Sequence, residues 1–100
     1  MLTLLSLALC AGLDRPQVTL AAPEPVLADG VPIDVGADIG HAGPQLRDLD
    51  GDGKPELLVS NFRGTIHVYR NVGELRAPRF ERAGHVTLAG AKDALKFHNW

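Results

Sequence analysis

An acidic loop punctuated by glycine constrains this sequence more than any other feature. Residues 48–56 read DLDGDGKPE, so carboxylates stand at the first, third, fifth and ninth positions, and the glycines between them allow the backbone to turn tightly. This stretch holds four acidic residues and one lysine, whereas the rest of the chain holds eight acidic and nine basic residues. Because the whole negative excess lies in one short segment, we expect the chemistry of the protein to reside there.

The spacing of these acids indicates a metal site. Carboxylates at alternate positions of a tight loop can converge on one point, and the main-chain carbonyl of the seventh position can turn inward beside them. Such hard oxygen donors suit Ca²⁺, which accepts about six to eight oxygen ligands. Without a cation the carboxylates would repel one another, so we expect a poorly ordered loop in the metal-free state. The alternative interpretation is a solvated Asp/Gly turn that holds no ion.

This loop differs from the helical calcium loop of the EF-hand. That loop closes with a bidentate glutamate at its twelfth position, where this chain has Val59, and it lies between two helices. Here the loop runs directly into ELLVSNF at 56–62, which is typical of a strand. The sequence therefore excludes a helical calcium sensor.

From residue 22 onwards the pattern predicts an all-β protein with short strands. Helical periodicity is not sustained, and glycine and proline recur every few residues. At 65–71, Ile66 and Val68 are predicted to face one side of a strand while His67 and Tyr69 face the other. Turn residues at 61–64 predict a hairpin with the preceding strand. The expected strands are 26–35, 44–49, 56–62, 65–71 and 79–88, and 91–97 could form one or two helical turns.

Residues 44–80 resemble a repeat of the FG-GAP or VCBS type, the calcium-loop blade of integrin-like β-propellers. The resemblance rests on the acidic loop followed by GTIHVY at 64–69, NVG at 71–73 and PRF at 78–80. It implies one antiparallel β-propeller blade of about four short strands, with part of a neighbouring blade, in an incomplete propeller. It also implies a set of Ca²⁺ ligands, with glutamate at the last position where many members of the family have aspartate. These ligands are Asp48, Asp50, Asp52, the carbonyl of Lys54, and Glu56.

A weak internal similarity accompanies this resemblance. Residues 27–36 can be laid over 82–90 with Gly30 on Gly84 and Gly36 on Gly90, an offset of 54 that two glycines alone do not establish as a repeat. The domain organisation that we expect is a leader at 1–21, an inter-blade segment at 22–43, the repeat at 44–80 and the start of a next blade at 81–100.

The N-terminus is typical of a secretory signal. Residues 2–13 are almost entirely apolar but too few for a membrane span, which needs roughly 20 residues, and a small-residue cleavage site at 19–21 would release Ala22. The segment departs from the usual pattern because no Lys or Arg precedes the apolar run. A buried segment of the fold is the alternative. Lipidation at Cys10 is a weaker alternative, because Leu9 stands where the signal peptidase needs a small residue.

The functional expectation follows from these features. Propellers need about four to eight blades to close, so we expect a fragment of a larger secreted or periplasmic protein whose partners are other blades or other chains. Its role would be structural, adhesive or ligand-binding, with an extracellular protein or carbohydrate as the ligand. The alternative is a scaffold or accessory domain of an extracellular polysaccharide hydrolase or lyase.

Other chemistry finds little support in the sequence. There is no catalytic motif and no paired-carboxylate constellation outside the loop, so we expect the chain itself not to be an enzyme. The net charge of −2 and the glutamates that interrupt the arginine-rich stretch argue against nucleic-acid binding, and membrane association is expected only if Cys10 is lipidated. The histidines lack metal-ligand spacing and are expected to be ordinary strand or loop residues; they are His41, His67, His85 and His98.

Overall fold

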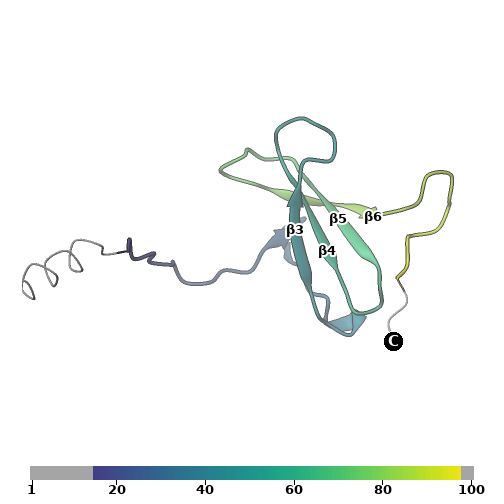
Figure 1. Cartoon of the computed structure of the whole chain (residues 1–100), viewed down its shortest axis with the longest axis horizontal. Helices are drawn as coiled ribbons and strands as arrows, with labels where there is room; N and C mark the ends of the chain where they lie inside the picture. The colour runs from purple at the N-terminus through teal and green to yellow at the C-terminus, as the bar shows by residue number, and fades with distance from the viewer. Residues whose placement is uncertain (1–14, 98–100) are drawn as a thin grey trace, which may run out of the picture.

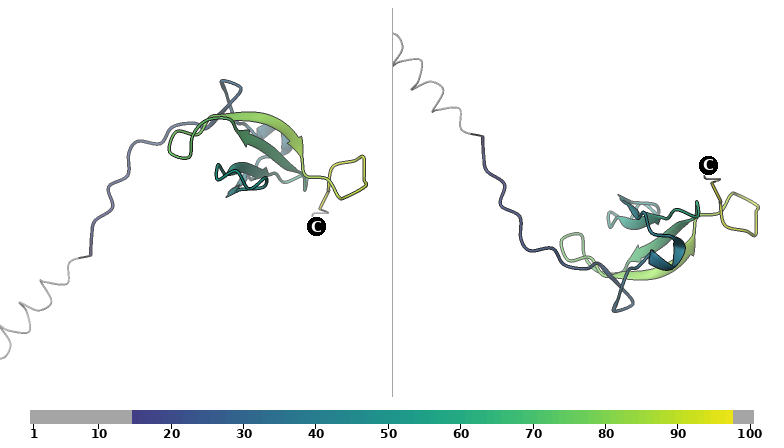
Figure 2. Two further views of the ribbon diagram at one scale, coloured as in Figure 1. Left: turned by 90° about the horizontal axis from the view of Figure 1, so that it is seen from above. Right: turned by 90° about the horizontal axis from the view of Figure 1, so that it is seen from below.

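The computed structural model describes residues 15–97 and shows an all-β chain built on one six-stranded sheet (Figure 1). The strand order is β2-β1-β6-β5-β4-β3, and neighbouring strands are antiparallel except for β1 and β6, which are parallel. Views from above and below show that the sheet is curled rather than flat (Figure 2). The all-β prediction is therefore confirmed. The elements are β1 (Leu27–Ala28), β2 (Val31–Pro32), the 3₁₀ turn η1 (Gly36–Asp38), β3 (Gly43–Arg47), β4 (Glu56–Ser60), β5 (Ile66–Asn71) and β6 (Phe80–His85).

Strands β3 to β6 form an antiparallel meander in chain order, close to the predicted strands 44–49, 56–62, 65–71 and 79–88. The acidic loop joins β3 to β4. The turn predicted at 61–64 joins β4 to β5, where Asn61 Oδ1 accepts hydrogen bonds from the main-chain N–H and the hydroxyl of Thr65 at 3.2 and 3.0 Å. Strand β6 crosses the expected boundary between 80 and 81, because all six of its residues lie in the same sheet as the repeat.

Residues 26–35 differ from the single strand that was predicted. Asp29 and Gly30 have φ values of 53° and 77°, so the chain reverses there and forms two strands of two residues each. Positive φ at both central residues is the geometry of a tight two-residue hairpin turn, for which Asp-Gly is a favoured sequence. Strand β1 then joins the meander through the parallel pair Ala28 and Phe80.

Residues 91–97 form no helical turn. The main-chain N–H groups of Leu95 and Phe97 donate to the carbonyls of Val86 and Gly64 at 2.7 and 2.8 Å, rather than to carbonyls four residues earlier. These long-range hydrogen bonds join the segment to the β4–β5 turn and to the residue after β6, and the helical possibility raised by its sequence is wrong.

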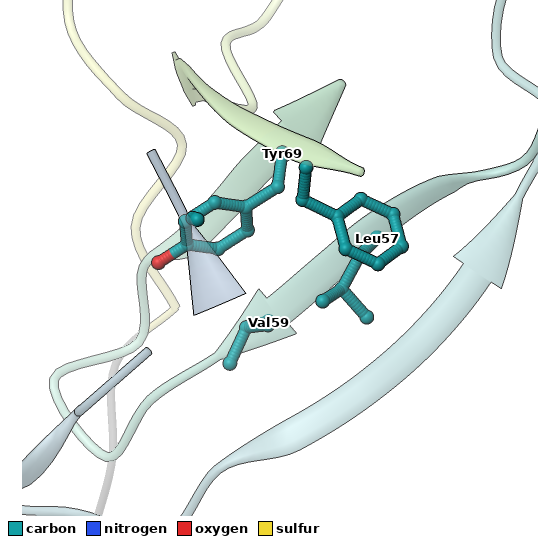
Figure 3. Packing of buried hydrophobic residues seen from close by; sticks show 5 residues of the cluster. Leu57, Val59 and Tyr69 are labelled. Carbon is teal, nitrogen blue, oxygen red and sulfur yellow. The ribbon is translucent and has the colours of Figure 1, made fainter. Parts of the chain in front are cut away.

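The core is small and lies on one face of the sheet. Leu57 pairs with Tyr69 and Val59 pairs with His67 across β4 and β5, so these four side chains project to the same face. Figure 3 shows the labelled members of the buried cluster gathered on that face. In β5 burial alternates over Tyr69 to Asn71, with Arg70 exposed between two buried residues, whereas residues 66–68 are all half-buried. The buried apolar residues are Ala28, Leu57, Val59, Tyr69 and Phe80.

The connection between β5 and β6 is closed by polar contacts. Asn71, buried at 4% exposure, accepts hydrogen bonds on Oδ1 from the N–H groups of Gly73 and Arg79 at 3.0 and 3.2 Å. Gly73 lies so close to the returning chain that a Cβ atom there would be 2.5 Å from the carbonyl oxygen of Ala77. This places Phe80, the first residue of β6, in the core.

The described residues before β1 carry no strand. Residues 15–26 have no regular secondary structure and are exposed. The leader predicted at 1–21 lies largely outside the described residues, and Cys10 lies wholly outside them. Within the described part of the chain, no helix has the length and apolar character required to span a membrane.

Candidate metal site

The acidic loop brings three of the predicted ligands together at one end of the sheet. It leaves β3 after Arg47 and enters β4 at Glu56, and these two residues are directly paired across the strands. Ligand oxygens of Asp48, Asp50 and Glu56 all lie within 4.8 Å of one another. An acidic triad of this size could hold a metal ion.

Hydrogen bonds from the loop's own backbone fix the aspartates. Asp48 accepts from Gly51 N at 2.8 Å through Oδ1 and from Gly53 N at 2.9 Å through Oδ2. The two glycines have φ values of 78° and 82°, in the left-handed region that other residues adopt only at a cost. Because both carboxylate oxygens of Asp48 are held by loop N–H groups, its orientation depends on this glycine geometry.

Glu56 is the buried member of the triad. Its residue exposure is 4%, and its Oε2 accepts a hydrogen bond from Leu49 N at 2.8 Å. Its other oxygen, Oε1, is buried and has no hydrogen-bond partner among the described residues. A buried carboxylate oxygen without a partner is costly, because the water that it loses on folding is not replaced. A cation beside Asp48 and Asp50 would supply the missing interaction.

The surroundings of Asp50 oppose the ionisation of its carboxyl group by raising its pKa. The hydrogen bond from the main-chain N–H of Asp52, 3.1 Å long, lowers the pKa of Asp50, but the pKa is raised overall. Desolvation and repulsion from the carboxylates of Asp52 and Glu56 outweigh the hydrogen bond. A bound cation would offset this repulsion and would therefore favour the ionised form of the carboxyl group.

The two other predicted ligands lie outside the triad. Asp52 Oδ1 accepts a hydrogen bond from Lys54 N at 2.8 Å, which closes a local turn. The Lys54 ammonium lies 3.7 Å from Glu74 Oε1, an exposed pair of small energetic weight. The geometry thus gathers Asp48, Asp50 and Glu56, while the prediction for Asp52 and for the Lys54 carbonyl stays a prediction.

Sequence reasoning missed a second polar cluster, around His67. Its Nε2 lies 3.4 Å from Asp38 Oδ2 and 3.1 Å from Asn61 Nδ2, and its ring centroid is 4.5 Å from that of His85. These residues come from η1, the β4–β5 turn, β5 and β6. Their spacing along the chain forms no recognisable motif. Only knowledge of the strand register could have predicted that these residues lie together.

Comparisons with family models, with curated proteins and with solved structures give no match for this chain.

Proposed function

We propose that this chain is a calcium-binding β-repeat of a secreted β-propeller protein, with a structural, adhesive or ligand-binding role. The observation that carries the proposal is the buried, unpartnered Oε1 of Glu56, a residue whose carboxylate lies together with those of Asp48 and Asp50. In a solvated turn that holds no ion, water would bind both carboxylate oxygens at no cost. Such a turn would have no reason to bury a carboxylate and leave one of its oxygens without a partner.

The metal we propose is Ca²⁺ because the donors are all oxygen atoms. Carboxylate oxygens favour hard cations, and the loop offers neither the thiolate nor the imidazole that would favour Zn²⁺. Mg²⁺ requires near-ideal octahedral geometry and keeps several waters, whereas Ca²⁺ tolerates an irregular cage. A loop whose donors include one long glutamate arm suits the less demanding ion.

The role we propose for the ion is to fix the β3–β4 connection. The ligands come from the loop and from the first residue of β4, so a bound ion would tie the loop to the sheet. The antiparallel meander of β3 to β6 supports the blade interpretation, because a propeller blade is a four-stranded antiparallel sheet. The chain's partners in this proposal are other blades of the same propeller or other chains.

Isothermal titration with Ca²⁺ tests the proposal. We expect one bound ion per chain, and Glu56→Gln should weaken binding at least tenfold because a neutral amide replaces the buried charged ligand. Glu81→Gln, an exposed glutamate on β6, is the matched control and should bind like the wild type. Mg²⁺ at the same concentration should bind more weakly. Equal Ca²⁺ affinity for the wild type and Glu56→Gln would remove the proposal.

A further inference from the structure

A pair of imidazoles lies at the opposite end of β4 and β5 from the acidic loop. His67 on β5 and His85 on β6 are directly paired in the antiparallel register, and their ring centroids are 4.5 Å apart with 49° between the ring planes. Directly paired residues project to the same face of a sheet, so the two rings lie side by side on the face that carries the core. Imidazole nitrogens are ligands for borderline transition metals rather than for Ca²⁺.

The environment of His67 leaves one ring nitrogen for such an ion. Asp38 Oδ2 and Asn61 Nδ2 both approach Nε2, at 3.4 and 3.1 Å, so Nδ1 is the nitrogen on the other side of the ring. Coordination through Nδ1 requires the tautomer that carries its proton on Nε2, and the Asp38 carboxylate is placed to accept a hydrogen bond from that N–H. Arg63 Nε, 3.6 Å from the other oxygen of Asp38, helps to hold the carboxylate in place.

This arrangement matches the second sphere of many metal-binding histidines. A ligating imidazole usually donates its other N–H to a carboxylate, which orients the ring and raises its basicity. Asn61 favours the opposite tautomer, because its amide nitrogen is a donor and its Oδ1 is already engaged by Thr65. Binding of an ion would therefore exchange the Asn61 contact at Nε2 for the hydrogen bond to Asp38.

We propose that His67 and His85 form a binding site for a divalent transition metal of the Zn²⁺ class, with Asp38 as a positioning residue and water completing the coordination. The His67 side chain is 20% exposed and His85 is exposed, so an ion with its waters can reach both rings. The ion would join β5 to β6 next to the register irregularity between Val68 and Tyr69.

The site is separate from the acidic loop in place and in chemistry. Val59, the partner of His67, lies three positions after Glu56 along β4, which corresponds to about 10 Å at the usual rise of a strand. The donors are nitrogen atoms at one end and oxygen atoms at the other. The inference therefore does not rest on the proposed calcium function, and the two can fail independently.

Zn²⁺ titration calorimetry of the full chain in saturating Ca²⁺ tests this site. The chain carries Cys10→Ser as background, because a thiolate is itself a strong zinc ligand. We expect one Zn²⁺ per chain, a loss of at least tenfold in affinity for His67→Ala and for His85→Ala, and a loss of about tenfold for Asp38→Asn. His41→Ala is the matched control, because the ring of this exposed histidine contacts that of Phe62 and is not a member of the pair, and it should bind like the background chain.

A second measurement needs no substitution in the pair and so does not depend on how the variants fold. Ring ¹⁵N chemical shifts of the background chain, recorded with and without Zn²⁺, report which nitrogen is protonated and which is bound. We expect metal-type shifts at Nδ1 of His67 and at one nitrogen of His85, with the His67 proton on Nε2, and no change at His41. Unchanged shifts at His67 and His85, or retained Zn²⁺ affinity in both alanine variants, would overturn the inference.

Discussion

Glu56 is the residue at which the sheet and the acidic loop meet. It is the first residue of β4, it is buried, and it supports the loop through the hydrogen bond from Leu49 N. A buried carboxylate with one oxygen unpaired destabilises the fold unless a cation or another donor completes its environment. Glu56 therefore has two roles as the last acidic residue of the loop: it holds the loop backbone by a hydrogen bond, and it offers a charged oxygen to a cation.

The glycines of the loop give a prediction about backbone conformation. Gly53 has a φ of 82°, and a Cβ atom at this position would meet nothing within 4 Å, so only the left-handed backbone resists substitution. We expect Gly53→Ala to lower the free energy of unfolding in Ca²⁺ by about 1–2 kcal/mol. Gly53→Asn should cost less, because asparagine tolerates this conformation better.

Chemical denaturation in Ca²⁺ measures both variants of Gly53. The ranking glycine, asparagine, alanine is the expected order of stability. Equal midpoints for alanine and asparagine would show that the left-handed backbone at Gly53 does not limit the loop.

At the scale of elements, the connection between β5 and β6 requires glycine at position 73 because a side chain there would not fit, and not because of its φ angle. A Cβ atom at Gly73 would be 2.5 Å from Ala77 O and 2.6 Å from Arg79 N, and both are backbone atoms. The clash would also separate Arg79 N from the side-chain Oδ1 of Asn71, to which it donates. The NVG and PRF segments thus act as one unit that returns the chain into β6.

Gly73→Ala tests this unit. We expect a loss of about 1–3 kcal/mol in the free energy of unfolding, as for other substitutions that overpack a closed site. Leu75→Ala, in the same connection but 63% exposed, is the control and should stay within about 0.5 kcal/mol of the wild type. A Gly73→Ala variant as stable as the Leu75→Ala control would mean that the connection can open without cost.

The sequence predicted the elements whose signals are local. Alternation in β5, the turn at 61–64 and the carboxylate spacing each lie within a few residues, and the meander and the triad follow from them. The Asp29–Gly30 reversal also has a local signal, but the apolar residues on either side of it suggested one continuous strand. The contacts of His67 with Asp38 and His85 could not be predicted in this way, because they depend on the register between β5 and β6 and on where η1 packs.

At the scale of the molecule, the sheet leaves an apolar groove uncovered. The groove has a volume of about 430 Å³ and runs beside β3, whose outer edge has no strand partner among the described residues. Leu46 on β3 is 58% exposed, and exposed edge strands invite pairing with another chain. In the proposed function another blade covers this surface. The groove is lined by Val26, Pro44, Gln45, Leu46, Leu57, Pro78 and Phe80.

This surface predicts self-association of the isolated chain. Sedimentation velocity over a concentration series in Ca²⁺ should show wild-type oligomers that dissociate on dilution. Leu46→Lys should raise the dissociation constant of the oligomer at least tenfold. Leu88→Lys, also exposed but outside the groove, should leave the equilibrium unchanged. A wild-type monomer at every concentration that melts cooperatively would contradict the need for a neighbouring blade.

Thermal unfolding of the wild type and of Asp50→Ala, each in Ca²⁺ and in a chelator, tests the central claim most directly. Because an ion that binds only the folded chain stabilises it, by about 2.7 kcal/mol at a hundredfold excess over Kd, we expect Ca²⁺ to raise the wild-type Tm by roughly 10 °C or more. Asp50→Ala should lose most of that increase and should melt close to the wild type in chelator. Equal melting of the two proteins in Ca²⁺ would contradict the claim that the acidic loop is a calcium site.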